Sequence, residues 1–127
     1  MGFPSPAADY AEDRISLDKE VIRHPNATFF ATMEGDSMVN AFIPPGALLV
    51  IDRSLTPRNM DIVLAIVRGE FTIRYLKKND FKAWLIPANS KLREQLITPE
   101  MEMEIRGVVI RIVTDPKTLP HVRFGGL

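Results

Sequence analysis

One short turn carries a residue that could act as a nucleophile. Gly35-Asp36-Ser37-Met38 follows a segment rich in Thr and Phe and precedes Val39-Asn40. A glycine permits a sharp bend that leaves the next hydroxyl exposed, and backbone N–H groups near Asp36 and Ser37 would then face a developing oxyanion. The alternative interpretation is an ordinary polar turn, in which Asp36 and Ser37 satisfy local backbone groups and do no chemistry.

The composition limits what could accompany this serine. The chain has no Cys, which excludes disulfides, thiolate metal sites and a cysteine nucleophile. It has two histidines, His24 and His121, and neither lies in a ligand-spaced motif such as His-Glu-x-x-His. We therefore expect no metal and no cofactor.

Charge and hydropathy narrow the class of protein further. The 127 residues fit one domain, and 46% apolar residues can supply one core. Lys and Arg number 16, as do Asp and Glu, so no net charge draws the chain to DNA or to anionic lipid. No apolar run spans a membrane, and Met1–Tyr10 lacks the apolar core of a signal peptide. The sequence predicts a cytoplasmic protein without direct sequence-specific DNA binding.

The N-terminal part predicts an arm and one short helix. Two prolines near the start disfavour helix, so residues 1–14 are expected to form a flexible, extended arm. Ser16 is a candidate N-cap for a helix over Ser16–Arg23, with apolar residues at helical spacing. His24-Pro25 should end that helix.

The rest of the chain is dominated by strand signals. Continuous apolar runs bounded by turn residues predict buried strands, and Arg68-Gly69 predicts a hairpin between two of them. Gly107 is a candidate bulge in the last strand. The expected strands are 28–33, 47–51, 62–67, 70–76, 83–86 and 101–113. Five or six strands predict a mostly β single domain over residues 15–127, built as a curled sheet or barrel.

Taken in order, these segments resemble the LexA/UmuD family, the self-cleaving serine proteases of peptidase family S24. Gly35-Asp36-Ser37-Met38 resembles the nucleophile motif of the family, and Gly2–Tyr10 and His24-Pro25 resemble the processed form of its UmuD members. Further matches in the family's order are Pro45–Val50, Asp61–Val63, Gly69–Thr72, Ile86–Ser90 and Gly107–Ile110. The resemblance implies the curled β-sheet of the LexA C-terminal protease domain.

The resemblance also identifies a missing base. Family members pair the serine with a lysine two residues after the threonine that is Thr72 here, and that position is Arg74. The resemblance thus implies that Ser37 occupies the nucleophile position, Arg74 the base position, and Gly35, Asp36 and Met38 the oxyanion turn. Burial can make a lysine neutral, but an arginine stays protonated and cannot take the serine's proton. We predict inefficient cleavage, and the alternative for Arg74 is a solvated strand residue without a role.

Two nearby lysines do not replace the base. Lys77 lies three residues beyond Arg74 and would point to the opposite face of a regular strand. Lys78 has the right parity but lies about 13 Å further along the strand. Neither lysine is expected to reach Ser37.

Gly2 stands where the first residue after the family's cleavage point would be, and only Met1 precedes it. Two explanations fit this processing-site remnant. The short form is encoded directly, as in a phage- or plasmid-borne homologue, or the chain was shortened and given an initiator Met. Arg74 favours the first explanation, because a protein made in processed form needs no base.

For function, the resemblance implies an accessory subunit of an error-prone translesion DNA polymerase in the SOS response. The implied partners are a second copy of the chain, a UmuC-like catalytic subunit, the RecA filament and a host UmuD chain. Phe3 and Tyr10 could anchor the arm on a partner or fold back on the domain, and the 101–113 strand could be core or dimer edge. The alternatives are an active Ser-dependent protease that cleaves itself or a partner, and the dimerisation domain of a repressor.

Overall fold

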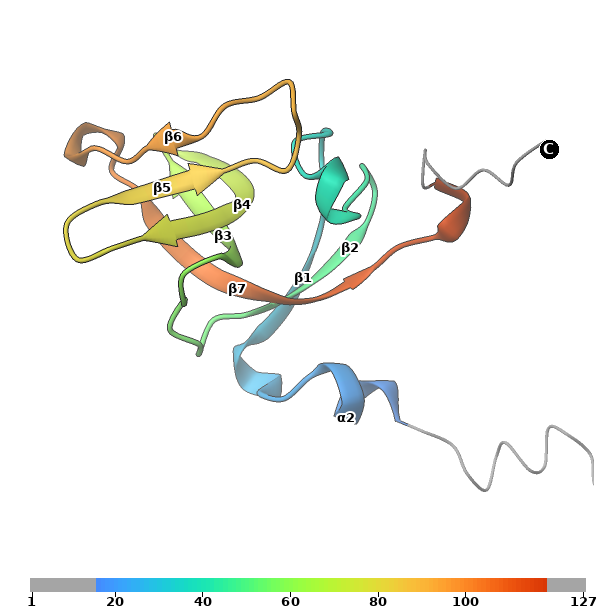
Figure 1. Ribbon diagram of the computed structural model, residues 1–127. Helices are drawn as coiled ribbons and strands as arrows, with labels where there is room; N and C mark the ends of the chain where they lie inside the picture. The colour runs from blue at the N-terminus through green and yellow to red at the C-terminus, as the bar shows by residue number, and fades with distance from the viewer. Residues whose placement is uncertain (1–15, 119–127) are drawn as a thin grey trace, which may run out of the picture.

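A computed structural model describes residues 16–118, which form a mostly β domain around one sheet (Figure 1). Seven strands lie in the order β1-β2-β7-β3-β4-β5-β6, and every neighbouring pair is antiparallel. The predictions about Gly2, Phe3, Tyr10, His121 and the arm over residues 1–14 lie outside the described residues. The elements are α2 (Leu17–Val21), β1 (Thr28–Thr32), β2 (Leu48–Asp52), β3 (Asp61–Val67), β4 (Glu70–Lys78), β5 (Ala83–Ile86), β6 (Gln95–Leu96) and β7 (Glu104–Val113).

The sheet is curled but open. β1 and β6 are its two edges and do not pair with each other, so the barrel that the sequence left open is wrong and the curled sheet is confirmed. β7 runs through the centre between β2 and β3, as Figure 1 shows. Among residues 16–118, no helix has the length and apolar character needed to cross a membrane.

Gly107 lies at one of the two irregularities that bend β7. The register of β7 against β3 shifts between Leu64 and Ala65, next to the pairing of Leu64 with Gly107. A Cβ atom at position 107 would lie 2.5 Å from Cγ2 of Ile51 and 3.2 Å from the carbonyl oxygen of Asp52. Gly107 keeps its pairing with Leu64, and the residue left without a partner is Arg106, so the expected irregularity lies immediately before Gly107. The absent side chain lets β7 approach β2 closely.

The hairpin of β3 and β4 sets the position of Arg74. Arg68 and Gly69 form its turn with φ values of 52° and 82°, the left-handed pair typical of a two-residue I′ turn. Val67 then pairs with Glu70, and the register continues to the pairing of Val63 with Arg74. The predicted hairpin is confirmed.

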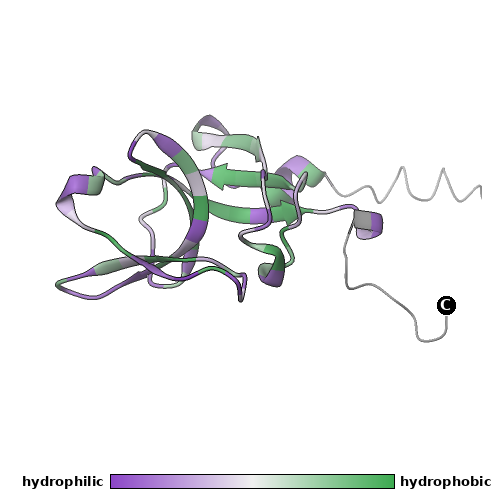
Figure 2. Cartoon of the chain, turned by 90° about the horizontal axis from the view of Figure 1, so that it is seen from above, coloured by the Kyte–Doolittle hydropathy of each residue, from purple (hydrophilic) through white to green (hydrophobic). Residues whose placement is uncertain are grey.

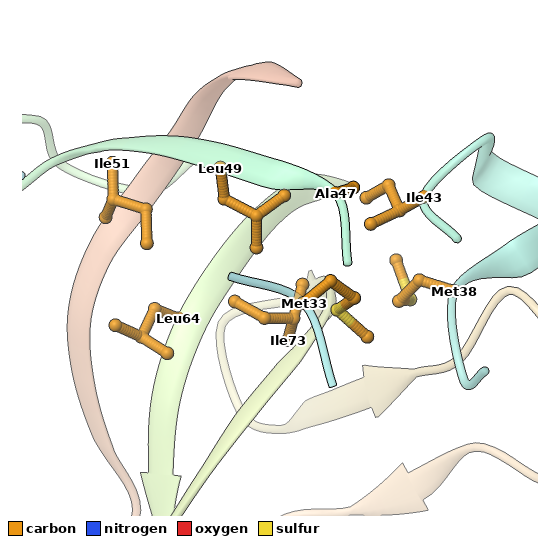
Figure 3. Packing of buried hydrophobic residues seen from close by; sticks show 8 residues of the cluster. All are labelled: Met33, Met38, Ile43, Ala47, Leu49, Ile51, Leu64 and Ile73. Atoms are coloured by element: carbon orange, nitrogen blue, oxygen red, sulfur yellow. The ribbon is translucent and has the colours of Figure 1, made fainter. Parts of the chain in front are cut away.

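Two apolar clusters hold the sheet, and hydrophobic residues concentrate along its strands (Figure 2). The first lies between the β1–β2 side and the β3–β4 hairpin, and Figure 3 shows its side chains converging on one interior space. Its buried members are Met33, Met38, Ile43, Ala47, Leu49, Ile51, Leu64 and Ile73. The second cluster contains Val63, Ala65, Leu76, Leu85 and Val108. Met38 belongs to the first cluster, so the serine turn is anchored in the core.

The helix is shorter than predicted. Ser16 caps it as expected, with its hydroxyl oxygen accepting from the backbone N–H of Lys19 at 3.5 Å. No residue of α2 is buried, so packing does not extend the helix, and Ile22 already has extended dihedral angles. Pro25 begins a separate 3₁₀ turn, Pro25–Ala27.

Several strand boundaries differ from the prediction. β7 begins at Glu104 rather than at Met101, because Pro99–Met101 forms a 3₁₀ turn and Glu102 has a left-handed φ of 48°. β6 was not predicted, since its two exposed residues carry no periodic pattern. β2 ends in a buried charge, Asp52, beyond the apolar run that the sequence analysis recognised.

Candidate functional site

The structure brings Ser37 and Arg74 into direct contact, although they lie 37 residues apart in the chain. Nη1 of Arg74 donates a hydrogen bond to Oγ of Ser37 at 2.8 Å. The same nitrogen donates to the carbonyl oxygen of Ile73 at 2.7 Å. Both side chains are partly buried. Arg74 is therefore not a freely solvated strand residue.

Two features hold the serine turn in place. Gly35 has a φ of 73°, a left-handed conformation that glycine adopts without strain. Met38 has no exposed surface and packs into the first core cluster. Ser37 is thus fixed between a permissive glycine and a buried methionine.

The segment after β5 braces the same turn. The N–H of Ala88 donates to the carbonyl oxygen of Ser37 at 2.8 Å, and the N–H of Asn40 donates to that of Ala88 at 2.8 Å. Nδ2 of Asn89 donates to the carbonyl oxygen of Asp36 at 2.9 Å. Sequence reasoning did not place Ala88 or Asn89 at the site. The one available signal was the resemblance of Ile86–Ser90 to a family segment.

The serine and the guanidinium lie along a cleft of about 970 Å³. The cleft runs between β1 with the serine turn on one side and the β3–β4 hairpin on the other. Buried Met33, Leu49 and Ile73 contribute apolar lining, while exposed charged residues also line it. These charged residues are Glu34, Asp36, Arg68 and Glu70.

The electrostatics of Arg74 follow from its position. Burial lowers the pKa of its guanidinium, but the ordinary pKa of an arginine lies so far above neutral pH that the group stays protonated. Within residues 16–118 no carboxylate forms a salt bridge with Arg74. The cleft therefore contains a partly buried positive charge without a described counter-ion.

The turn also offers backbone donors. In the described part of the chain, the N–H groups of Asp36, Ser37 and Met38 donate to no protein acceptor. Backbone N–H groups of this kind can stabilise an oxyanion or a bound anion. Gly35, Asp36 and Met38 thus form a turn with the donors that the sequence analysis expected near Asp36 and Ser37.

The two lysines after Arg74 have other contacts. Nζ of Lys77 lies 5.0 Å from the ring centroid of Trp84. Nζ of Lys78 donates to the carbonyl oxygen of Pro57 at 2.8 Å. The expectation that neither lysine reaches Ser37 is confirmed by these contacts.

A second polar cluster lies at the end of β2 and was not predicted. Asp52 is 1% exposed, and its Oδ2 lies 2.6 Å from Nδ1 of His24. Its Oδ1 accepts from the N–H and the hydroxyl of Ser54 at 2.8 and 2.6 Å. Burial opposes ionisation, but the hydrogen bonds of Ser54 and His24 hold the pKa of Asp52 below its ordinary value. The cluster ties the segment after α2 to the sheet.

Neither polar cluster, in the described residues, has the set of side chains that a metal ion requires. Across residues 16–118, no group of three or more His, Cys, Asp or Glu side chains could hold a metal ion. His24 has a single carboxylate partner, Asp52, in the described residues. His24 therefore contributes to a hydrogen-bonded tie between two segments.

The chain matches one known protein family over most of its length. The sequence profile of the Peptidase S24-like family matches residues 1–110. The chain belongs to the Peptidase S24-like family. This match confirms the resemblance on which the sequence analysis relied, and the serine turn and the β3–β4 hairpin both lie inside the matched residues.

Individual relatives are similar over most of the chain. MucA of Salmonella typhimurium is 40% identical over 109 residues, covering 85% of this chain and 74% of MucA. ImpA of Escherichia coli is 41% identical over 112 residues, covering 88% and 76%. LexA repressor 1 of Geobacter sulfurreducens is 35% identical over 112 residues, covering 87% and 55%. The relatives of this chain therefore include MucA and ImpA as well as a LexA repressor.

Proposed function

We propose that this chain is a non-catalytic, UmuD′-like accessory subunit of an error-prone translesion DNA polymerase. The observation that carries the proposal is the hydrogen bond from Nη1 of Arg74 to Oγ of Ser37. A serine hydroxyl becomes a useful nucleophile only when a partner accepts its proton. Here the partner is itself a protonated donor, so Ser37 has no base.

The geometry supports a protein that keeps the protease scaffold without the reaction. The turn, the cleft and the backbone donors are all present, and the side chain at the base position reaches the hydroxyl. A lysine there could lose its proton on burial, whereas arginine does not. The difference between a protease and a binding subunit therefore rests on one side chain.

The proposed partners follow from the family and from the relatives. The subunit would act as a homodimer on a UmuC-like catalytic subunit at the RecA filament, in the cytoplasm, and would also pair with a host UmuD chain. Within this proposal, residues 15–127 are the S24-like domain and residues 1–14 are a contact segment with Phe3 and Tyr10 as anchors. Gly2 occupies the position that follows the family's cleavage point.

The exposed apolar edge of the sheet supports a second copy as partner. Leu48 pairs with Val113 across β2 and β7, and the two are 38% and 53% exposed. Phe30 on the neighbouring edge strand β1 is 54% exposed. Apolar side chains gathered near a free strand edge are typical of a protein–protein contact. We propose this face for the dimer contact.

Co-expression tests the accessory role. The chain is expressed with a UmuC-like polymerase subunit, and the purified complex is assayed for lesion bypass in a reconstituted reaction. We expect the Ser37→Ala variant to support the same bypass as the unmodified chain, because the serine performs no reaction. Failure of the unmodified chain to bind or activate the polymerase subunit would refute the proposal.

An active protease is the competing function, and one assay separates it. The unmodified chain is incubated with a peptide that contains a family-type cleavage segment, and products are followed by mass spectrometry. Efficient cleavage that Ser37→Ala abolishes would establish the protease and exclude a non-catalytic serine.

A further inference from the structure

Arg74 presents a partly buried charge to the cleft without a described carboxylate partner. Removing a charge from water is costly unless another charge or several hydrogen bonds compensate. Nη1 bonds Ser37 and Ile73, while in the described residues Nε and Nη2 donate to no protein acceptor. The guanidinium therefore has a free edge that an anion could occupy.

Other donors lie beside the guanidinium. Oγ of Ser37 accepts from Arg74, so its own hydrogen remains available to donate. The turn adds the backbone N–H groups of Asp36, Ser37 and Met38, which have no protein acceptor in residues 16–118. A guanidinium binds a carboxylate in a planar, bidentate arrangement, and a hydroxyl with backbone amides completes a site for such an anion.

The edge strand β1 lies on the same cleft. The N–H of Met33 donates to the carbonyl oxygen of Ala47, and the carbonyl oxygen of Met33 accepts from the N–H of Gly46. The backbone groups of Met33 therefore face the β2 side. Alternation along an antiparallel ladder then turns the backbone groups of Thr32 and Phe30 away from β2. These groups can pair with an extended peptide, as exposed sheet edges do in strand-addition complexes.

We propose that the cleft binds an extended peptide by its free C-terminal carboxylate, held by Arg74 and Ser37, with the peptide backbone along β1. The proposal rests on the proposed function, because it needs Arg74 to be a charged donor rather than a base. The scaffold of a serine protease suits this arrangement. In such an enzyme the new carboxylate of the cleaved product lies beside the nucleophile, and here the C-terminal carboxylate of the bound peptide would lie beside Ser37 in the same way.

The charges along the cleft set a preference among peptides. Glu34, Asp36 and Glu70 line it and are exposed, so water and salt screen them more than the partly buried guanidinium. They do not cancel Arg74, but they repel acidic side chains near the peptide terminus. The cleft therefore favours peptides with neutral or basic residues before the carboxylate.

Two matched peptides test the proposal. Acetyl-Thr-Val-Thr-Ala is prepared with a free carboxylate and as the C-terminal amide, and each is titrated into ¹⁵N-labelled protein while amide shifts are followed. We expect the carboxylate form to bind about tenfold tighter, in line with a charge-assisted pair. Amide shifts should concentrate at Asp36–Met38, β1 and β4.

Variants assign the effect to the site. Arg74→Gln should reduce the preference for the carboxylate to less than about twofold, and Ser37→Ala should reduce it partly, by about threefold. Arg111→Gln is the matched control, because Nη1 of Arg111 also donates to the preceding carbonyl oxygen, that of Ile110, at 2.7 Å, but on an exposed surface away from the cleft. It should keep the full preference.

The outcomes that overturn the proposal are distinct from those that overturn the proposed function. Equal affinity for the two peptides, or a preference that survives both Arg74→Gln and Ser37→Ala in folded protein, would refute carboxylate binding. Cleavage of the amidated peptide at a peptide bond, detected by mass spectrometry, would refute the non-catalytic function. The affinity difference between the two peptides decides the carboxylate proposal in either case.

Discussion

The two polar clusters of this domain have similar components and opposite electrostatics. At the end of β2, the buried carboxylate of Asp52 has both oxygens bonded, to His24 and to Ser54. At the cleft, the guanidinium of Arg74 bonds Ser37 but has no described carboxylate partner. The first cluster is satisfied within the protein and serves stability. The second keeps donors free toward a cleft, and free donors are what a binding site requires.

The comparison also bears on the proposed loss of peptide-bond cleavage. A fully satisfied charge such as Asp52 is fixed by its neighbours, whereas the charge at the base position depends on the identity of one side chain. Arginine keeps the contact with Ser37 but removes the option of a neutral base. A scaffold can therefore retain its geometry while its chemistry changes from cleavage to binding.

The largest expected effect comes from restoring the base with Arg74→Lys. A lysine at the cleft can lose its proton on burial and accept that of Ser37, so cleavage of a supplied family-type segment should rise by about 10²-fold or more. Product formation is measured by mass spectrometry. The double variant Arg74→Lys, Ser37→Ala is the control and should be inactive. No gain in Arg74→Lys would mean that the scaffold has lost more than its base.

The next largest effect concerns the satisfied cluster. Asp52→Ala removes the common acceptor of His24 and Ser54 and should lower the free energy of unfolding by about 2–3 kcal/mol. Urea denaturation followed by circular dichroism measures the change. Asp80→Ala, at an exposed position in the loop between β4 and β5, is the control and should shift stability by less than about 0.5 kcal/mol. Equal effects of the two substitutions would show that the Asp52 cluster is not structural.

Acid should weaken the contribution of the Asp52 cluster to stability. The pKa of Asp52 is lower in the folded state than in the unfolded chain, so its carboxylate stabilises the fold above the unfolded pKa of about 4. That contribution is lost as pH falls through the lower folded-state pKa. We expect the stability difference between the unmodified chain and Asp52→Asn to be largest at pH 7 and to shrink by pH 3. A difference that stays constant over this range would contradict the assignment.

The smallest effects distinguish two serines. Ser54→Ala removes the hydroxyl bond to Asp52 and leaves the backbone N–H bond in place, and should cost about 1 kcal/mol. Ser37→Ala should change stability by less than about 0.5 kcal/mol, because water in the open cleft can replace the hydroxyl as a partner of Arg74. The same urea titrations measure both. If Ser37→Ala lowered the free energy of unfolding more than Ser54→Ala, the stabilising role assigned to the Asp52 cluster and the binding role assigned to the cleft would be contradicted.

The sequence alone determined the local features. Apolar runs predicted five of the seven strands closely, and left-handed turn residues predicted the β3–β4 hairpin, because both depend on neighbours in the chain. The serine turn and the arginine at the base position were also readable, since each is a matter of residue identity at a known spacing. Because an arginine stays protonated, these residue identities alone predict that Ser37 has no base.

The tertiary structure alone decided how distant residues meet. The bond between Ser37 and Arg74, the brace from Ala88 and Asn89, and the burial of Asp52 against His24 join segments whose separation no periodic pattern encodes. The two-residue β6 forms only because β5 offers a partner. The irregularity beside Gly107 and the close approach of β2 there are likewise features of the assembled sheet.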